Sequence, residues 1–239
     1  MDTATDQLSL ALGRVGGEVI AAWTSAVPKM HATLFHPLLD ELLATVQLGF
    51  DDIDAIVVGV GPGSYTGVRI AVTAAKAFAH TLGIPVLSVS SLEAAAYAAH
   101  AHKGFIVVAW DARRSAAYSA AFHCDPARAL WERALPDGRR EIAQLAEEVA
   151  AIAHGDGVLL LGNAAQALYD ALAKTGRGER VTVFDARNFM SGEMLLKLGS
   201  DALRQQQNGV RGVKVHGIVP NYSQAAEAQA RLSPRIQGE

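Results

Sequence analysis

The chain is organised around a glycine-rich stretch that reads Val57-Val58-Gly59-Val60-Gly61-Pro62-Gly63-Ser64-Tyr65-Thr66-Gly67-Val68-Arg69-Ile70. The apolar residues at its start predict a buried strand over residues 55–60. The glycines predict a tight loop, and the alanine-rich residues that follow predict a helix over residues 68–82. A strand, a glycine loop and a helix are therefore expected in succession.

The glycine loop has two interpretations that the sequence leaves open. Gly61, Gly63 and Gly67 allow backbone angles or close approaches that other residues do not, and Ser64 or Thr66 can cap the amides that open the helix. Such a turn can be tight and buried, or it can hold an anion. The loop lacks the Lys-Ser/Thr pair of a Walker A motif and does not follow the GxGxxG register, so it identifies no particular phosphate ligand.

The helix over residues 68–82 is apolar around most of its circumference. Its polar side chains form one narrow stripe, which consists of Arg69, Thr73, Lys76 and His80. Such a helix must be covered on most sides, either by its own domain or by a partner protein. An amphipathic helix predicted over residues 31–47 adds a row of leucines, and the two helices together could form half of a bundle that another chain completes. The candidate interface residues are His31, Leu34, Leu38, Leu42, Tyr65, Val68, Ala71, Val72, Ala75 and Phe78.

The composition is that of an ordinary globular protein. Of the 239 residues, 50% are hydrophobic and 19% are charged, and the net charge of −3 gives no sign of a nucleic-acid surface. No apolar run approaches the roughly 20 residues needed to cross a bilayer, and the first residues do not resemble a signal peptide. We therefore expect a soluble, cytoplasmic protein without membrane contact. The single cysteine, Cys124, excludes an internal disulfide and a cysteine-rich metal site.

The two halves of the chain begin in the same way. Asp2-Thr3-Ala4-Thr5 precedes a predicted strand over 8–12, and Asp111-Ala112-Arg113-Arg114-Ser115 precedes an apolar run over 116–122. Acid and hydroxyl residues at such turns can face a phosphate or its metal ion, or they can bond their own backbone. The candidate nucleotide-binding residues are Asp2, Thr3, Thr5 and Asp111. The repeat predicts two related α/β lobes, residues 1–101 and 102–239, with a helix over 191–206 packing back on the first lobe.

The remaining elements follow from periodicity and turn residues. Strands are predicted over residues 19–23, 84–89, 105–110, 158–161 and 181–184, helices over 141–153 and 164–174, and a turn over 135–138. Alternation of strands and helices indicates partly parallel sheets covered by helices.

Five motifs give the chain a resemblance to a known family. They are Asp2-Thr3-Ala4-Thr5 with Ser9-Leu10-Ala11-Leu12, His31 six residues before Pro37, the loop from Gly61 to Arg69, Ser88-Val89-Ser90-Ser91-Leu92-Glu93, and Asp111-Ala112-Arg113. On these residues the chain resembles the TsaB family, formerly YeaZ, closely over residues 2–122 and thinly afterwards. The resemblance implies two ribonuclease-H-like lobes of the actin/hexokinase/Hsp70-like (ASKHA) fold, with mixed sheets covered by helices.

The resemblance also implies a function. It is the making of threonylcarbamoyladenosine, the tRNA modification next to the anticodon, in which a TsaB protein binds and activates the catalytic paralogue TsaD together with the ATPase TsaE. A homodimer when TsaD is absent and only indirect contact with tRNA are implied as well. The helices over 31–47 and 68–82 are the implied TsaD-binding region. No tightly bound cofactor is implied, and ATP or ADP is a candidate ligand within the complex.

The chain departs from the related sequences at three places. Ser91-Leu92-Glu93-Ala94-Ala95 stands where TsaD carries His-Leu-Glu-Gly-His, whose two histidines bind the catalytic metal. Only Met1 precedes the Asp-Thr-Ala-Thr motif, where family members usually carry an apolar strand, so the first sheet is expected to lack its leading strand. The family's Pro-x-Tyr-Leu-Arg motif reads Pro220-Asn221-Tyr222-Ser223-Gln224, without the arginine.

These departures bear on catalysis. Serine and alanine do not replace two imidazole ligands of a first-row metal, so we expect a metal-free, non-catalytic partner subunit and not an enzyme. Two alternatives stay open: an independent nucleotide-binding ATPase or sugar kinase of the ASKHA fold, and a glycoprotease-like peptidase.

Overall fold

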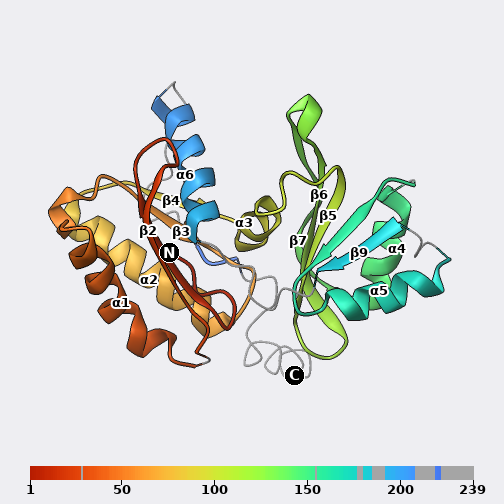
Figure 1. The fold of residues 1–239 in the computed structure, drawn as a ribbon. Helices are drawn as coiled ribbons and strands as arrows, with labels where there is room; N and C mark the ends of the chain where they lie inside the picture. Colours follow the sequence, from red (N-terminus) through yellow and green to blue (C-terminus); the bar gives the residue numbers. More distant parts are fainter. Residues whose placement is uncertain (28, 154, 177–179, 185–191, 208–218, 222–239) are drawn as a thin grey trace, which may run out of the picture.

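The computed structural model describes residues 1–27, 29–153, 155–176, 180–184, 192–207 and 219–221. They form two lobes with the short helix α3 (Ser91–Tyr97) between them, as Figure 1 shows. Each lobe consists of β-strands with helices packed against them, so the expected two-lobed α/β fold is confirmed.

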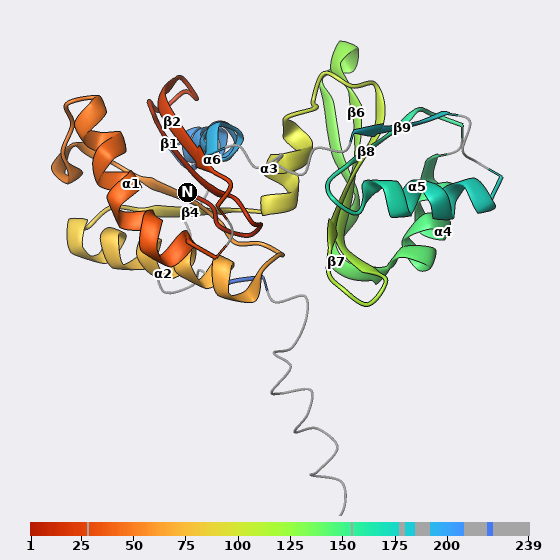
Figure 2. The same cartoon turned by 60° about the horizontal axis from the view of Figure 1, so that its bottom comes forward.

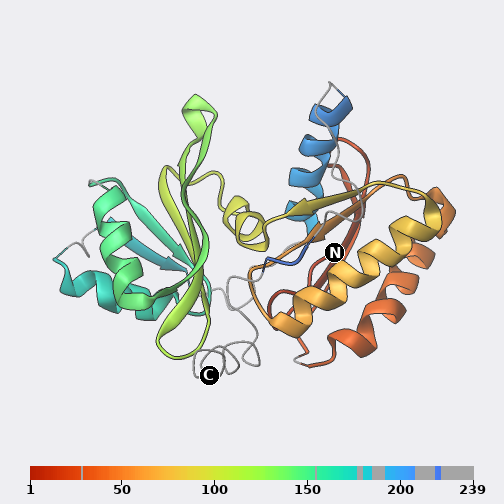
Figure 3. The same ribbon diagram turned by 180° about the vertical axis from the view of Figure 1, so that it is seen from behind.

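The first lobe contains two small sheets between helices. Strands β1 (Leu8–Gly13) and β2 (Val19–Ser25) pair antiparallel, and β3 (Ile56–Gly59) and β4 (Val86–Val89) pair parallel. Helices α1 (His31–Thr45) and α2 (Tyr65–Leu82) cover one side of these strands, and α6 (Gly192–Gln207) covers the other (Figures 2 and 3). A 3-10 turn, η1 (Phe50–Asp52), precedes β3.

Met1 and Asp2 lie between the two small sheets and bond to both. The Met1 amino group donates to the Val57 carbonyl (2.8 Å), and the Met1 carbonyl accepts from the Gly59 amide (3.0 Å). On the other side, Asp2 and Ser9 exchange two backbone hydrogen bonds of 2.9 Å. Beyond Met1 the space between β1 and β3 continues as a cavity of about 540 Å³, walled by β1, α1, α2, α6 and the residues that lead into β3.

The second lobe contains one sheet of five strands in the order β7-β6-β5-β8-β9. Strands β5 (Gly104–Asp111), β6 (Ala116–Asp125) and β7 (Leu130–Glu141) are antiparallel neighbours, whereas β8 (Val158–Leu161) and β9 (Val181–Phe184) run parallel to β5. Helices α4 (Ile142–Ala153) and α5 (Ala165–Lys174) pack on one face of this sheet, and η2 (Pro126–Arg128) connects β6 and β7. The first lobe has a matching order: β2 and β1 come first, Met1 and Asp2 take the place of β5, and β3 and β4 follow.

One expected turn lies inside a strand. Residues 135–138 belong to β7, although Leu135-Pro136-Asp137-Gly138 has the composition of a turn. The pairing of β6 with β7 shifts register between Ser119 and Phe122, opposite this stretch. A bulge on an edge strand accommodates a proline, because Pro136 then has no ladder bond to donate.

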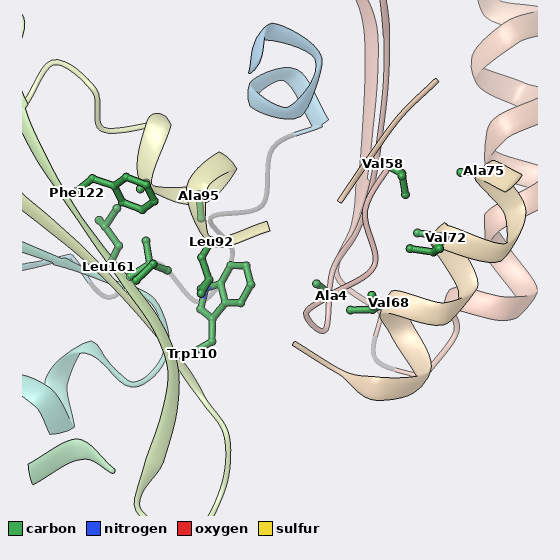
Figure 4. Close-up of a cluster of buried hydrophobic side chains, with 14 of the residues drawn as sticks. Ala4, Val58, Val68, Val72, Ala75, Leu92, Ala95, Trp110, Phe122 and Leu161 are labelled. Atoms are coloured by element: carbon green, nitrogen blue, oxygen red, sulfur yellow. The ribbon is translucent and has the colours of Figure 1, made fainter. Parts of the chain in front are cut away.

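The largest hydrophobic cluster extends through both lobes. Figure 4 shows side chains of the first lobe, such as Val58 and Val72, together with Trp110 and Phe122 of the second lobe and Leu92 of α3. A second cluster lies between the five-stranded sheet and α4 and α5. A third lies between β1 and α1. Helix α6 contacts β1 to β4 and α3; the division into domains at residues 101 and 102 stays a proposal.

Candidate functional site

The glycine loop closes on the chain's own amino-terminal residues. The Ser64 amide donates to the Ala4 carbonyl (2.7 Å), and the Thr3 hydroxyl donates to the Gly67 carbonyl (2.6 Å). A methyl group at Gly63 would clash with the Ala4 carbonyl, and one at Gly67 with the Thr3 carbonyl. These glycines are therefore needed because two backbone segments touch, and this favours the tight buried turn.

Helix α2 begins at this loop with a side-chain cap. The Ser64 hydroxyl accepts the Gly67 amide at 3.3 Å, which satisfies one of the amides that open the helix. The helix ends at Gly83, whose φ of 70° is the left-handed conformation that glycine adopts at helix ends. Both ends of α2 thus follow from local sequence.

Asp2 and Ser91 form a buried polar pair at the centre of the first lobe. The Ser91 hydroxyl donates to the Asp2 carboxylate at 2.5 Å and accepts the Gly61 amide at 3.0 Å. The other carboxylate oxygen accepts the Ala4 amide at 2.6 Å. Burial raises the pKa of Asp2, whereas the bonds from Ser91 and Ala4 oppose this rise.

The residues expected to replace metal ligands do not offer a metal site. Ser91 is fully buried and its hydroxyl is occupied by Asp2 and Gly61, while Ala95 is fully buried and has no donor atom. Within the described part of the chain, no group of three or more His, Cys, Asp or Glu side chains is placed to hold a metal ion. A metal bound as in TsaD therefore does not fit these residues.

The candidate nucleotide-binding residues lie in two separate places. Asp2 and Thr3 are buried, and Thr5 accepts the Gln7 amide at 3.1 Å within the same short segment. Asp111 is exposed at the carboxyl end of β5 in the other lobe, where it accepts the Arg113 amide and its own amide donates to Asn163, both at 2.8 Å. Thr5 and Asp111 are engaged in turns of their own segments, whereas Asp2 bonds to Ser91 and Thr3 bonds to Gly67. Nucleotide binding by these residues stays a prediction.

The candidate interface residues on α1 and α2 differ in exposure. Five of them are buried within this chain and have no surface to offer a partner: Leu42, Val68, Ala71, Val72 and Ala75. His31 is also buried, and its Nε2 atom has no hydrogen-bond partner among the described residues. Leu34, Leu38 and Phe78 are half-buried, and Tyr65 is exposed beneath the Arg69 guanidinium at 4.0 Å. The role of the set as an interface stays a prediction. The buried members would hold the exposed residues in place and would not contact a partner themselves.

The outward surface of α1 and α2 includes small and polar residues that the candidate set omits. Thr73, Ala77 and His80 face outward on α2, and Ala44 does so on α1. The polar stripe on α2 indicates this side, whereas the alanine pattern alone does not separate exposed Ala77 from buried Ala75. We call this surface, made by the exposed residues of α1 and α2, the α1–α2 face.

The contact between the lobes was not indicated by any motif. Glu93 of α3 accepts hydrogen bonds from Arg133 and from the Trp131 indole (3.4 Å), both on β7. Because the sequence does not predict β7 as a strand, it does not predict the contacts of Trp131 and Arg133 either. The alternation of Trp131 and Arg133 is the signal that could have revealed it.

None of the helices in the described ranges has the length and apolar character that a membrane span requires. The carboxyl-terminal Pro-Asn-Tyr-Ser-Gln sequence is described only as far as Asn221, whose amide donates to the Val60 carbonyl at 2.7 Å. Tyr222 to Gln224 lie outside the described residues.

Comparison with known proteins gives similarities over most of the chain. The family model described as TsaD, tRNA N6-adenosine threonylcarbamoyltransferase, matches residues 25–232. The tRNA threonylcarbamoyladenosine biosynthesis protein TsaB of Bacillus subtilis is 33% identical over 236 residues, covering 97% of this chain and 95% of that protein. TsaB of Escherichia coli is 34% identical over 127 residues, covering 52% of this chain and 54% of that protein.

Two solved structures from Pseudomonas aeruginosa share the fold over nearly the whole chain. YeaZ has a TM-score of 0.74 and 26% identity, covering 92% of this chain and 96% of its own. A protein described as similar to the peptidase YeaZ has a TM-score of 0.75 and 26% identity, covering 93% and 97%.

Proposed function

The chain belongs to the TsaB (YeaZ) family of tRNA threonylcarbamoyladenosine biosynthesis proteins, and on this premise we propose that it is the non-catalytic partner of TsaD. It would bind and activate TsaD for threonylcarbamoyl transfer to the tRNA adenosine next to the anticodon, with TsaE as a further component. Its contact with tRNA would be indirect, and the surface that binds TsaD would pair two copies of the chain when TsaD is absent.

The observation that carries this proposal is the chemistry of residues 91–95. The Ser91 hydroxyl is committed to Asp2 and Gly61, and the Ala95 methyl is buried, so neither can polarise a substrate or hold a catalytic metal. We infer that a chain of the same pathway without that chemistry contributes through binding.

The α1–α2 face is the binding surface that we propose. The two helices pack against each other, half-buried Leu34, Leu38 and Phe78 border the cluster between β1 and α1, and Ala77 of α2 is exposed. A small side chain at the centre lets a partner helix approach closely, and the flanking apolar groups would then be buried. Two helices from each protein would form a four-helix contact.

A pair of alanine substitutions tests this surface. Ala77→Arg places a large side chain on the α1–α2 face, whereas Ala173→Arg makes the same change at an exposed position of α5 in the other lobe. Overpacking of about 1 to 3 kcal/mol predicts a roughly five- to hundredfold weaker affinity of Ala77→Arg for TsaD. Ala173→Arg should bind as the unchanged protein does.

Calorimetric titration with TsaD gives the affinity, and thermal melting confirms that both variants are folded. Folded Ala77→Arg with unchanged affinity would place the interface elsewhere. Ala71→Arg, at a fully buried position of the same helix, should fail to fold and so distinguishes core from surface.

A further inference from the structure

Helix α3 is packed into both lobes at once. Ala94 belongs to a cluster with Val89 of β4 and Leu195 of α6, on the side of the first lobe. Leu92 and Ala95, all but free of solvent contact, belong to the large cluster with Trp110, Phe122 and Leu161 of the second lobe (Figure 4). A helix whose opposite sides are both buried cannot move with one lobe without losing its packing against the other.

Charged and aromatic groups surround this packing at its rim. Arg133 of β7 pairs with Glu93 of α3 and with Asp137, and its guanidinium lies 4.6 Å from the centre of the Phe122 ring. Trp131 stacks on Phe122 at 5.0 Å and donates to Glu93. The side chains of Arg133 and Glu93 are 32% and 28% exposed, so water screens the pair only in part.

The segment that leads from α3 into β5 is also fixed. The Cys124 thiol of β6 donates to the His100 carbonyl at 2.9 Å, and the His102 amide donates to the Ala99 carbonyl at 2.8 Å. Tyr97 stacks on His100 and meets the edge of Trp131. Hinges are short segments whose backbone angles change freely, and this segment has tertiary contacts that oppose such a change.

We propose that α3 and the Glu93–Arg133 pair lock the two lobes at one angle, so that this chain does not open and close on a ligand between its lobes. The cause is geometric: rotation of the lobes would separate Glu93 from Arg133 and uncover Leu92, Ala95 and Phe122 together. The inference goes beyond the proposed function, because it concerns the isolated chain and holds whether or not TsaD binds the α1–α2 face.

The distance between the lobes tests the proposal. Spin labels are attached in the variant Asp51→Cys/Ala173→Cys, which has one exposed label site in each lobe, while native Cys124 is buried and unreactive. Double electron–electron resonance should give one narrow distance distribution. Addition of ATP with Mg²⁺ should leave its centre within the original width. Two distances, or a shift on addition of ATP with Mg²⁺, would overturn the lock.

A matched pair of substitutions tests the role of the ion pair. Arg133→Met removes the ion pair between the lobes, whereas Arg140→Met removes the Arg140–Glu148 pair (2.8 Å), which lies within the second lobe. We expect a broadened distribution for Arg133→Met only. Should Arg133→Met fail to fold, Glu93→Gln removes the charge and keeps an acceptor for Trp131. A folded Arg133→Met or Glu93→Gln protein with the unchanged distribution would refute the role of the pair.

Discussion

Ser91 connects three segments that are far apart in the sequence. Its hydroxyl donates to Asp2 at the amino terminus and accepts from Gly61 of the glycine loop, while its own amide donates to the Gly61 carbonyl at 2.9 Å. The residue that departs from the histidine of TsaD is thus a structural centre in this chain. A hydroxyl is small enough to be enclosed here, and it both donates and accepts.

Replacement of Ser91 should therefore destabilise the fold strongly. Ser91→Ala leaves the Gly61 amide without its acceptor and the buried Asp2 carboxyl without its closest donor, so we expect a loss of about 2 to 4 kcal/mol. Ser90→Ala is the control, because Ser90 only caps α3 by accepting the Glu93 amide at 3.1 Å, a bond worth about 1 kcal/mol. Urea unfolding measures both. An equal or smaller loss for Ser91→Ala would contradict this account.

The Met1 amino group makes stability depend on pH. Burial lowers its pKa from 8.0 to about 6, with the Asp2 carboxylate opposing the shift. Between these values the unfolded chain binds more protons than the folded chain, so stability rises with pH and the gain is complete above 8.0. A shift of this size corresponds to about 3 kcal/mol.

Acetylation removes the ionisable amino group. The raised pKa of Asp2 makes stability fall as pH rises above 3.8, and acetylation strengthens this fall because it removes the amino-terminal charge that lowers the Asp2 pKa. Both effects change the difference between the two chains in the same direction. The difference in unfolding free energy between the acetylated and free chains should shrink as pH rises from 6 to 8. A difference that does not change with pH would show that the amino group is hydrated in the folded protein.

At the scale of the elements, the first lobe has a strand-shaped space at its centre. Asp2 pairs antiparallel with Ser9 of β1, and Met1 lies parallel to β3 between Val57 and Gly59. Continuation of this pattern directs the backbone groups of Ala11 and Gly13 on one side, and of Val57 on the other, into the cavity. The cavity is apolar on both faces, with Leu42 and Phe78 on one side and Leu196 on the other.

An apolar extension should fill this space. About five residues added before Met1 span about 16 Å and would form three or four backbone hydrogen bonds. We therefore expect the free energy of unfolding to rise by more than about 3 kcal/mol and the Tm by about 6–12 °C. A Gly-Ser extension of equal length, which has no side chains to fill the cavity, is the control. Equal melting of the two extended proteins would show that the cavity does not accept a strand.

The sequence predicted most elements but not β7. Residues 8–13, 65–82 and 158–161 have a clear period and recognisable ends, so their boundaries lie within a few residues of those expected. β7 runs through Pro136-Asp137-Gly138, a turn signature that is overridden by pairing with β6 and by a bulge. The turn propensity of these residues is overridden because pairing with the long antiparallel strand β6 supplies backbone hydrogen bonds that a turn would not make.

At the scale of the whole molecule, the sequence predicted which segments form the candidate site but not which of their side chains are exposed. Helical spacing placed Ala71, Ala75 and Ala77 on an alanine-rich helix, but only the positions of β3 and α1 decide that Ala77 faces outward. Likewise, Asp2 and Asp111 head similar turns, yet only the fold shows that Asp2 is enclosed and Asp111 is exposed. Burial is a property of the assembled lobes, and no local pattern encodes it.

This chain has two lobes at a fixed angle, as we propose, and a glycine loop that bonds to its own residues Thr3 and Ala4. Such a chain is suited to present the α1–α2 face to a partner in one fixed geometry. Reconstituted tRNA modification tests whether this chain acts as a partner of TsaD. With tRNA and a threonylcarbamoyl donor present throughout, formation of threonylcarbamoyladenosine is measured with TsaD and TsaE, with and without this chain, and with this chain alone. We expect no product from this chain alone, product when all three proteins are combined, and a large loss of product when Ala77→Arg replaces the unchanged protein. Product formed by this chain alone, or formed equally fast by TsaD and TsaE without it, would contradict the account.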